Sequence, residues 1–416
     1  MPQMMKFSTF AIVFLLYFSS MLLVLGQVNS DSESTLRVLL EVKKSFVEDP
    51  QNVLGDWSEN NTDYCSWRGV SCELNSNSNS ISNTLDSDSV HVVVALNLSD
   101  SSLTGSISPS LGRLQNLLHL DLSSNSLMGS IPPNLSNLIS LESLLLFSNQ
   151  LTGHIPTEFG SLTSLRVMRL GDNALTGTIP ASLGNLVNLI NLGLASCGIS
   201  GSIPSQLGQL SLLENLILQD NELMGPIPIE LGNCSSLTVF TAANNKLNGS
   251  IPSELGRLGN LQILNLANNS LSWEIPSQLG EMSQLVYMNF MGNQLEGAIP
   301  PSLAQLGNLQ NLDLSMNKLS GGIPEKLGNM GDLAYLVLSG NNLNCVIPRT
   351  ICSNATSLEH LMLSESGLHG EIPAELSQCQ QLKQLDLSNN ALNGSIPLEL
   401  YGLLGLTDLL LNNNTL

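Results

Sequence analysis

Leucines recur along the chain in an alternating pattern that restarts every 24 residues. The run from Leu120 to Asn125, Leu-Asp-Leu-Ser-Ser-Asn, shows the unit: two leucines flank one polar residue, and an asparagine follows three positions later. Such alternation predicts a short β-strand whose leucines point inward and whose intervening residues point outward. The asparagine falls at the next bend, where its side chain can satisfy backbone groups that would otherwise be buried without a partner.

The asparagine position marks this period through almost the whole chain. One extra residue near Cys352 shifts the phase once, after which the 24-residue step resumes. The position is occupied by Ser101, Asn125, Asn149, Asn173, Cys197, Asn221, Asn245, Asn269, Asn293, Asn317, Asn341, Ser366, Asn390 and Asn414. The unit matches the leucine-rich-repeat consensus, which also allows cysteine at the asparagine position. Because one unit cannot bury its leucines alone, the copies must stack into a solenoid.

The second half of each unit predicts the opposite side of that solenoid. It reads Leu-x-Gly-x-Ile-Pro, as in residues 127–132, and then Leu-Gly-x-Leu-x-x-Leu, as in residues 183–189. Proline fixes φ and removes a backbone donor, so this stretch suits a turning convex flank, followed by a 3₁₀ or irregular turn. The predicted fold class is therefore an α/β leucine-rich-repeat solenoid. Its right-handed superhelix would carry parallel β-strands on the concave face and a 3₁₀ or irregular convex side.

The repeats occupy only part of the chain, which divides into four segments. Residues 1–27 have a lysine followed by an apolar run and predict a cleaved signal peptide, with an uncleaved membrane anchor as the alternative. Residues 28–72 predict a helical N-terminal cap. Residues 73–90 are rich in Ser, Asn and Asp and predict a disordered insertion. Residues 91–416 hold about 13–14 repeats, the last cut short, from which we expect a fragment or truncated gene product.

A secretory start makes disulfides and glycans expected chemistry. Cys65 and Cys72 are seven residues apart, as are Cys345 and Cys352, and each pair predicts a local disulfide. The three other cysteines, Cys197, Cys234 and Cys379, lie inside repeats and predict free thiols, with bridges as the alternative. Nine Asn-x-Ser/Thr sequons are potential glycan acceptors: Asn60, Asn97, Asn134, Asn233, Asn248, Asn268, Asn354, Asn393 and Asn413.

The outward strand positions predict where a ligand binds. Apolar and aromatic side chains there mark a binding surface, unless neighbouring strands cover one another's side chains. Arg169 is the cation that the repeat phase places on this face, where it could contact a sulfate or carboxylate or pair with Asp172. The predicted concave-face ligand residues are Phe147, Arg169, Asp172, Ile217, Gln219, Asp220, Tyr287 and Met291.

Composition excludes several other classes of function. The net charge is −20 with only 14 basic residues, which disfavours nucleic-acid binding. No kinase or nucleotide-binding motif, nucleophile elbow or metal spacing occurs, so we predict no enzyme, no cofactor and no metal. Asp121, Asp313 and Asp386 recur at one outward position; paired acids could indicate glycosidase chemistry, but a solvated repeat position is the simpler account.

The cap and repeats together resemble the ectodomains of plant leucine-rich-repeat receptor-like Ser/Thr kinases. The resemblance rests on the cap Cys-Ser-Trp-Arg-Gly-Val-Ser-Cys (residues 65–72) and the Leu-x-Gly-x-Ile-Pro repeats, and covers about residues 30–416. Three stretches resemble the GASSHO receptors in particular: Leu-Gln-Asp-Asn (218–221), Asn-Cys-Ser-Ser-Leu-Thr-Val-Phe-Thr-Ala-Ala (233–243) and Ile-Cys-Ser-Asn (351–354).

The resemblance implies a cell-surface receptor that perceives a secreted, tyrosine-sulfated peptide together with a co-receptor kinase, in development or barrier formation. Members of that group also have later repeats, a membrane helix and a kinase, none of which this sequence contains. The implied location is the outer side of the plasma membrane for a full-length receptor, or the apoplast for the chain as it stands. The alternatives are a soluble inhibitor similar to polygalacturonase-inhibiting proteins and a secreted decoy.

Overall fold

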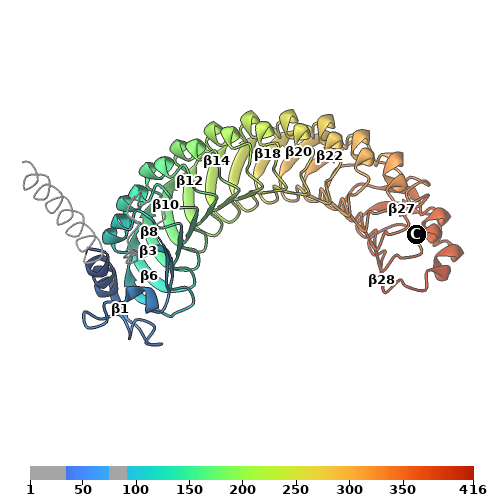
Figure 1. Ribbon diagram of the computed structural model, residues 1–416. Coiled ribbons are helices and arrows are strands. Elements are labelled where there is room, and N and C mark those ends of the chain that lie inside the picture. Colours follow the sequence, from blue (N-terminus) through green and yellow to red (C-terminus); the bar gives the residue numbers. More distant parts are fainter. Residues whose placement is uncertain (1–33, 75–90) are drawn as a thin grey trace, which may run out of the picture.

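The chain forms one curved array of stacked repeats (Figure 1). The computed structural model describes residues 34–74 and 91–416; the predicted signal peptide and residues 75–90 of the predicted insertion lie outside the described residues. Residues 34–45 are α-helical, and the other helical elements of the described part are 3₁₀ turns of three or five residues. These turns run along the outer edge of the arc, which confirms the prediction of 3₁₀ structure on the convex side.

The Leu-x-Leu segments form one sheet of 15 strands on the inner side of the arc. β2 and β3 pair antiparallel, and every later neighbour pairs parallel, one repeat after another. In chain order the strands are β2 (Val70–Leu74), β3 (His91–Asn97), β5 (His119–Asp121), β7 (Ser143–Leu145), β9 (Val167–Arg169), β11 (Asn191–Gly193), β13 (Asn215–Ile217), β15 (Val239–Thr241), β17 (Ile263–Asn265), β19 (Tyr287–Asn289), β21 (Asn311–Asp313), β23 (Tyr335–Val337), β24 (His360–Met362), β26 (Gln384–Asp386) and β28 (Asp408–Leu410).

A second sheet, of 11 strands, occupies the flank that the sequence predicted only as a turn. The Leu-x-Gly segments extend and pair, while the proline that follows lies beyond the strand and caps a 3₁₀ turn, as Pro180 does. Proline therefore removes no bond of this sheet. The strands are β1 (Phe46–Glu48), β4 (Thr104–Ser106), β6 (Ser126–Ser130), β8 (Gln150–His154), β10 (Ala174–Thr178), β12 (Gly198–Gly201), β14 (Glu222–Gly225), β16 (Lys246–Gly249), β18 (Ser270–Trp273), β20 (Gln294–Ala298) and β22 (Lys318–Ser320).

The second sheet ends at the irregular repeat. No strand of the described chain lies between β23 and β24, and a separate pair, β25 (His369–Glu371) and β27 (Ala391–Asn393), follows. The inner sheet continues without a break, because Tyr335 of β23 pairs with His360 of β24 across 25 residues. The extra residue is accommodated on the convex side, where residues 349–354 form turns and bends in place of a five-residue 3₁₀ turn.

The 3₁₀ turns return the chain from the second sheet to the inner sheet. Their buried Leu and Gly residues pack against the next repeat, as Leu183 and Gly184 do. They are η1 (Tyr64–Ser66), η2 (Pro109–Arg113), η3 (Pro133–Asn137), η4 (Thr157–Ser161), η5 (Ala181–Asn185), η6 (Ser205–Gln209), η7 (Ile229–Asn233), η8 (Ser253–Arg257), η9 (Ser277–Glu281), η10 (Pro301–Gln305), η11 (Glu325–Asn329), η12 (Ala374–Gln378) and η13 (Leu398–Gly402).

The repeated asparagines form a ladder beside the core. Asn125 shows the pattern: its Nδ2 donates to the carbonyls of Leu98 and Leu122 at 2.8 and 3.1 Å, and its Oδ1 accepts from the Leu103 amide at 2.9 Å. The same contacts recur at Asn221 and Asn317, for example. Each side chain thus satisfies backbone groups of two successive repeats, which confirms the role predicted for this position.

The N-terminal cap closes the first repeat with aromatic residues. Trp57 and Trp67 stack with ring centroids 5.3 Å apart, and both are buried. The Trp57 Nε1 donates to the Arg68 carbonyl at 3.1 Å. Cys65 and Cys72 form the disulfide predicted for this loop.

The disulfide predicted between Cys345 and Cys352 is wrong. Cys352 is bonded to Cys379, which was predicted to be a free thiol, and Cys345 is free. Cys352 and Cys379 are both buried in the core of adjacent repeats, where stacking brings their Cα atoms to 5.2 Å. Cys345 instead occupies the flank, next to Gly322 of the preceding repeat. Cys345 and Cys352 are therefore close in sequence, but Cys345 lies on the flank and Cys352 lies in the core.

The other two cysteines, Cys197 and Cys234, are free, as predicted. Cys234 has the repeat position of a core leucine, and burial raises the pKa of its thiol to about 11. Burial also raises the pKa of Cys197, which replaces the ladder asparagine. Both thiols are therefore protonated and unreactive at neutral pH.

Candidate functional site

Arg169 and Phe147 form the most specific contact on the inner face. The guanidinium carbon of Arg169 lies 4.3 Å from the centre of the Phe147 ring, a cation–π geometry. Phe147 is half-buried and Arg169 is exposed. Arg169 forms no ion pair with Asp172, whose carboxylate instead accepts a hydrogen bond from Ser148 at 3.4 Å. The positive charge is thus held over an aromatic platform and open to an anion from solvent.

The face beside this pair carries very small side chains. Gly171 and Ala195 follow Phe147 in the same row, and Gly193 follows Arg169. A Cβ at Gly171 would lie 2.7 Å from the Ala195 carbonyl oxygen, so no larger residue fits there. A ligand chain can therefore approach the backbone between Arg169 and the next large side chain.

Ile217 and Gln219 form the far side of this low stretch. Ile217 pairs in register with Gly193, and both Ile217 and Gln219 are half-buried. The Gln219 Oε1 is buried and has no hydrogen-bond partner in the described chain. A buried acceptor without a donor costs free energy, so rotation of this side chain to place the oxygen against a donor of a bound molecule would relieve that cost.

Asp172 and Asp220 owe their identity partly to the backbone. Both lie at the repeat position with positive φ, at 51° and 58°. Most repeats place Ser, Asp, Asn or Gly there, because these residues adopt left-handed geometry at the lowest cost. Asp220 also accepts a hydrogen bond from Asn244 at 2.7 Å. Their carboxylates are exposed on the concave rim. The backbone geometry alone explains why aspartate occurs at both positions, without a role in ligand binding.

Tyr287 and Met291 form a second cluster further along the face. Asn289 lies between them: its Nδ2 donates to the Tyr287 hydroxyl at 3.0 Å, and its Oδ1 accepts from the Met291 amide at 2.9 Å. The sequence predicted exposed side chains at Phe147, Ile217, Tyr287 and Met291, but all four are half-buried. Neighbouring strands cover part of each residue, as in any cross-strand ladder.

A third cluster lies next to Tyr287, at outward positions that the repeat phase identified but that were not among the predicted ligand residues. The rings of Tyr335 and His360 stack 4.4 Å apart at an angle of 6°, and Asn311 lies between Tyr287 and Tyr335 in the same row. The Asn311 Oδ1 is buried without a partner in the described chain, like the oxygen of Gln219. The signal available in the sequence was the run of aromatic and amide residues at one outward position of consecutive repeats.

The candidate residues do not converge into one pocket. β9 and β19 are five strand steps apart in the inner sheet. At about 4.8 Å a step, the span from Arg169 to Tyr287 is about 24 Å, the length of about seven residues of extended peptide. This surface can hold an elongated ligand along the arc, and it offers little to a compact small molecule.

The recurring aspartates are explained by local structure. Asp121, Asp313 and Asp386 each accept hydrogen bonds from the amide and hydroxyl of the serine two residues later, at distances of 2.5–3.0 Å. They cap the bend after each strand. They are not arranged as a pair of catalytic acids.

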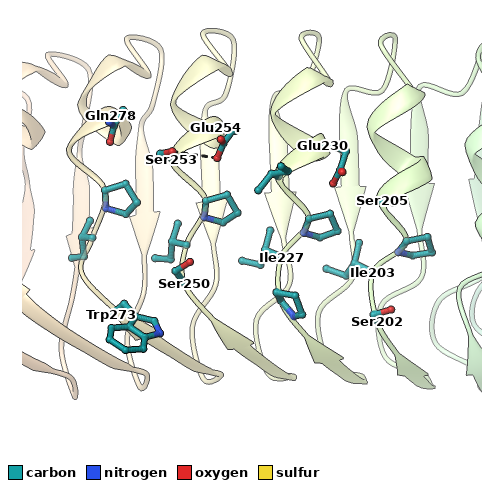
Figure 2. A pocket seen from close by; sticks show the side chains of 18 of the residues that line it. Ser202, Ile203, Ser205, Ile227, Glu230, Ser250, Ser253, Glu254, Trp273 and Gln278 are labelled. Carbon is teal, nitrogen blue, oxygen red and sulfur yellow. Dashed lines mark hydrogen bonds between the residues drawn. The ribbon is translucent and has the colours of Figure 1, made fainter.

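A separate groove lies on the flank, away from all the predicted ligand residues. It measures about 1710 Å³ and runs between the second sheet and the 3₁₀ turns, from Thr157 to Pro300. Figure 2 shows Ile203, Ile227 and their neighbouring prolines along its middle, with Glu230 and Glu254 on the side of the 3₁₀ turns. Trp273 stands on the opposite side. The groove follows the repeated Ile-Pro segments and so reflects the period of the fold.

The sequons differ in how free their side chains are. The amide of Asn268 donates to the Asn244 oxygen at 2.8 Å on the concave rim, and that of Asn413 donates to Asn389 at 2.5 Å. Asn248 and Asn393 are exposed on the flank and make no side-chain hydrogen bond in the described chain.

We expect Asn268 to carry no glycan and Asn393 to carry one, because a glycan on Asn268 would displace the hydrogen bond to Asn244 on the concave rim, whereas Asn393 is exposed on the flank and makes no such bond. Site-resolved glycopeptide mass spectrometry of the chain secreted from plant or insect cells measures both occupancies in one sample. Equal occupancy at Asn268 and Asn393 would contradict this expectation.

The described residues contain no membrane-crossing helix and no cluster of metal-binding side chains. None of the helices in residues 34–74 and 91–416 is long and apolar enough to cross a bilayer. Within the same ranges, no group of three His, Cys, Asp or Glu side chains could hold a metal ion.

Comparison with known proteins agrees with this architecture. The leucine rich repeat N-terminal domain family matches residues 33–73, and the Leucine Rich Repeat family matches residues 116–138, 140–162, 164–186, 260–282, 308–330 and 381–403. The Arabidopsis thaliana LRR receptor-like serine/threonine-protein kinase GSO1 is 60% identical over 114 residues, which are 26% of this chain and 7% of that protein.

Solved structures extend the similarity over most of the chain. The ectodomain of the receptor kinase GASSHO1/SCHENGEN3 from Arabidopsis thaliana, in complex with CASPARIAN STRIP INTEGRITY FACTOR 2, is 61% identical with a TM-score of 0.85. That match covers 91% of this chain and 44% of the solved chain. The Arabidopsis receptor kinase HAESA, in complex with the peptide hormone IDA and the co-receptor SERK1, is 35% identical with a TM-score of 0.65, over 91% of this chain and 69% of that one.

The chain spans less than half of the GASSHO1 ectodomain, and its matches to receptor kinases fall within their repeat regions. The chain belongs to the leucine-rich-repeat ectodomains of plant receptor kinases, with the GASSHO receptors among its relatives.

Proposed function

We propose that this chain is the ligand-binding part of a plant receptor kinase and binds a secreted, tyrosine-sulfated peptide on its concave face. The observation that carries the proposal is the 61% identity, over 91% of the chain, to an ectodomain solved with the peptide CASPARIAN STRIP INTEGRITY FACTOR 2. The proposed location is the extracellular side of the plasma membrane, reached through the secretory pathway. The proposed partner is a co-receptor kinase, as in the HAESA complex with SERK1.

The surface chemistry supports a peptide with an anionic group. Arg169 is held over Phe147 without a carboxylate partner, so its guanidinium can donate two parallel hydrogen bonds to a sulfate. The small residues Gly171 and Gly193 allow a peptide backbone to come close. The Gln219 side chain, which now holds its oxygen in a buried position without a donor, rotates to accept from a peptide amide, and Ile217 covers an apolar side chain.

Isothermal titration of the secreted chain with a synthetic peptide of the sequence of CASPARIAN STRIP INTEGRITY FACTOR 2 tests the proposal. We expect saturable binding that weakens by at least about tenfold when the tyrosine carries no sulfate, because charge-assisted hydrogen bonds contribute about 1.5–3 kcal/mol. Absence of binding by either peptide would overturn the proposal for this peptide class. Equal binding of both would overturn the role of the sulfate.

A further inference from the structure

Trp273 occupies a position that glycine holds in the neighbouring repeats. Gly225, Gly249 and Gly297 have φ between 77° and 79°, and Trp273 has φ of 69°. Glycine adopts this left-handed region without cost, whereas a bulky aromatic residue rarely does. The indole is 63% exposed, so burial in the bare chain does not offset the backbone cost. A strained and exposed tryptophan on a repeated surface indicates a partner for the ring.

The direction of the Trp273 side chain follows from the neighbouring glycines. A Cβ built on Gly249 would lie 3.6 Å from the Cβ of Pro226, and one on Gly297 would lie 2.7 Å from the Cγ of Glu274. In each case the contacted residue is the one 23 positions earlier. The same offset directs Trp273 toward Ser250, and Figure 2 shows the indole on the strand side of the groove that both residues line.

Ser250 is the third residue of the sequon Asn248-Gly249-Ser250. Asn248 lies on β16, which pairs with β18, the strand that ends at Trp273. Asn248 is in register with Ser270, three residues before Trp273, so a sugar on Asn248 starts about 4.8 Å across the sheet and about 10 Å along the strand from Trp273, a gap that the sugar ring and the indole can bridge. The Asn248 side chain is exposed and makes no hydrogen bond in the described residues.

We propose that Asn248 is N-glycosylated and that Trp273 is the platform on which the first N-acetylglucosamine packs. The Asn248 Nδ2 forms a bond to the anomeric carbon of a lipid-linked oligosaccharide, the bond from that carbon to the lipid diphosphate breaks, and the amide proton passes to a base of the enzyme. The secretory pathway supplies this donor, and its oligosaccharide transferase catalyses the step. The C–H face of the pyranose ring then covers the indole face. This contact gives the exposed ring the partner that the protein lacks.

The chain offers a selective probe of this contact. It has three tryptophans, and Trp57 and Trp67 are buried in the cap. Quenching of tryptophan fluorescence by acrylamide therefore reports on Trp273. Because the sugar covers one face of the ring, we expect the quenching constant of the secreted chain to be lower by roughly half than that of the Asn248→Gln variant.

Two controls separate this contact from a general effect of glycans. Asn393 has the same Asn-Gly-Ser sequence and left-handed glycine, at Gly394, but no tryptophan beside it; Asn393→Gln should leave quenching unchanged. Digestion with endoglycosidase H leaves one N-acetylglucosamine and should preserve the protection, whereas complete removal of the glycan should abolish it. The Trp273→Gly variant should show the same quenching with and without the glycan, which would assign the glycan-dependent change in quenching to Trp273.

Two results would overturn the proposal. If glycopeptide mass spectrometry finds Asn248 unmodified in the secreted chain, the proposed glycan does not exist. If Asn248 carries a glycan but the Asn248→Gln variant shows unchanged acrylamide quenching, the glycan does not contact Trp273.

Discussion

Replacing Asn221 with alanine is expected to lower the free energy of unfolding by about 3 kcal/mol, because a buried polar group left without its partner costs about 1–3 kcal/mol and this change orphans several. Asn221 is only 7% exposed. Its Nδ2 donates to the carbonyls of Leu194, Leu218 and Gln219 at 2.8, 3.1 and 3.2 Å, and its Oδ1 accepts from the Ile199 amide at 3.1 Å.

Urea unfolding gives the size of this effect, and hydrogen exchange locates it. The Ile199 amide should exchange faster in the variant, because its acceptor is gone. Asn185→Ala is the matched control: Asn185 is exposed at the end of η5 and its side chain makes no hydrogen bond in the described chain. If the two variants unfolded at the same urea concentration, water would be replacing the lost side chain.

Replacing Arg169 with alanine is expected to weaken binding of a tyrosine-sulfated peptide by about tenfold to a hundredfold, following from about 1.5–3 kcal/mol for charge-assisted hydrogen bonds. The change should have little effect on the unsulfated peptide, because the guanidinium has no other anionic partner. Arg169 is exposed, so the variant should fold normally. Phe147→Ala should give a smaller loss, because it removes the platform and leaves the charge.

Titration of both peptides against both proteins measures this coupling directly. Arg166→Ala is the charge-matched control, since Arg166 lies three residues earlier in the same repeat and should leave the affinity unchanged. An Arg169→Ala variant that keeps the wild-type preference for the sulfated peptide would assign sulfate recognition to another residue.

The inner half of each repeat was predictable because one physical requirement fixes it. Leucines at positions such as 120 and 122 must be buried, so their alternation with polar residues predicts the strand. The asparagine at 125 must satisfy the hydrogen-bonding groups of the backbone at the bend. The second sheet was not predictable in this way. Its Leu-x-Gly segment resembles a turn, and the strand is visible only when the neighbouring repeats are present to pair with it.

The errors at the site have the same origin. Phe147 and Tyr287 were predicted to be exposed, but the Arg169 side chain lies over the Phe147 ring. Ile263 and Asn311 lie beside Tyr287 in the neighbouring strands. Cys345 and Cys352 are close in the sequence, whereas the pairing of Cys352 with Cys379 depends on whether each thiol lies in the core or on the flank. Sequence spacing describes neighbours along the chain, and a solenoid makes most of its contacts between repeats.

The gap in the second sheet at the irregular repeat has a mechanical consequence. Elsewhere two sheets join each repeat to the next, but between β22 and β25 the flank is joined by isolated backbone hydrogen bonds, from Asn342 to Leu319 and from His369 to Cys345, in place of paired strands. A rod supported on two sides bends most easily where one support is weakest, so flexing of the arc should concentrate at this repeat. The Cys352–Cys379 bond ties the irregular repeat to the one that follows, in the core behind the inner sheet. The disulfide therefore reinforces the contact between the two repeats that the sheets join most weakly.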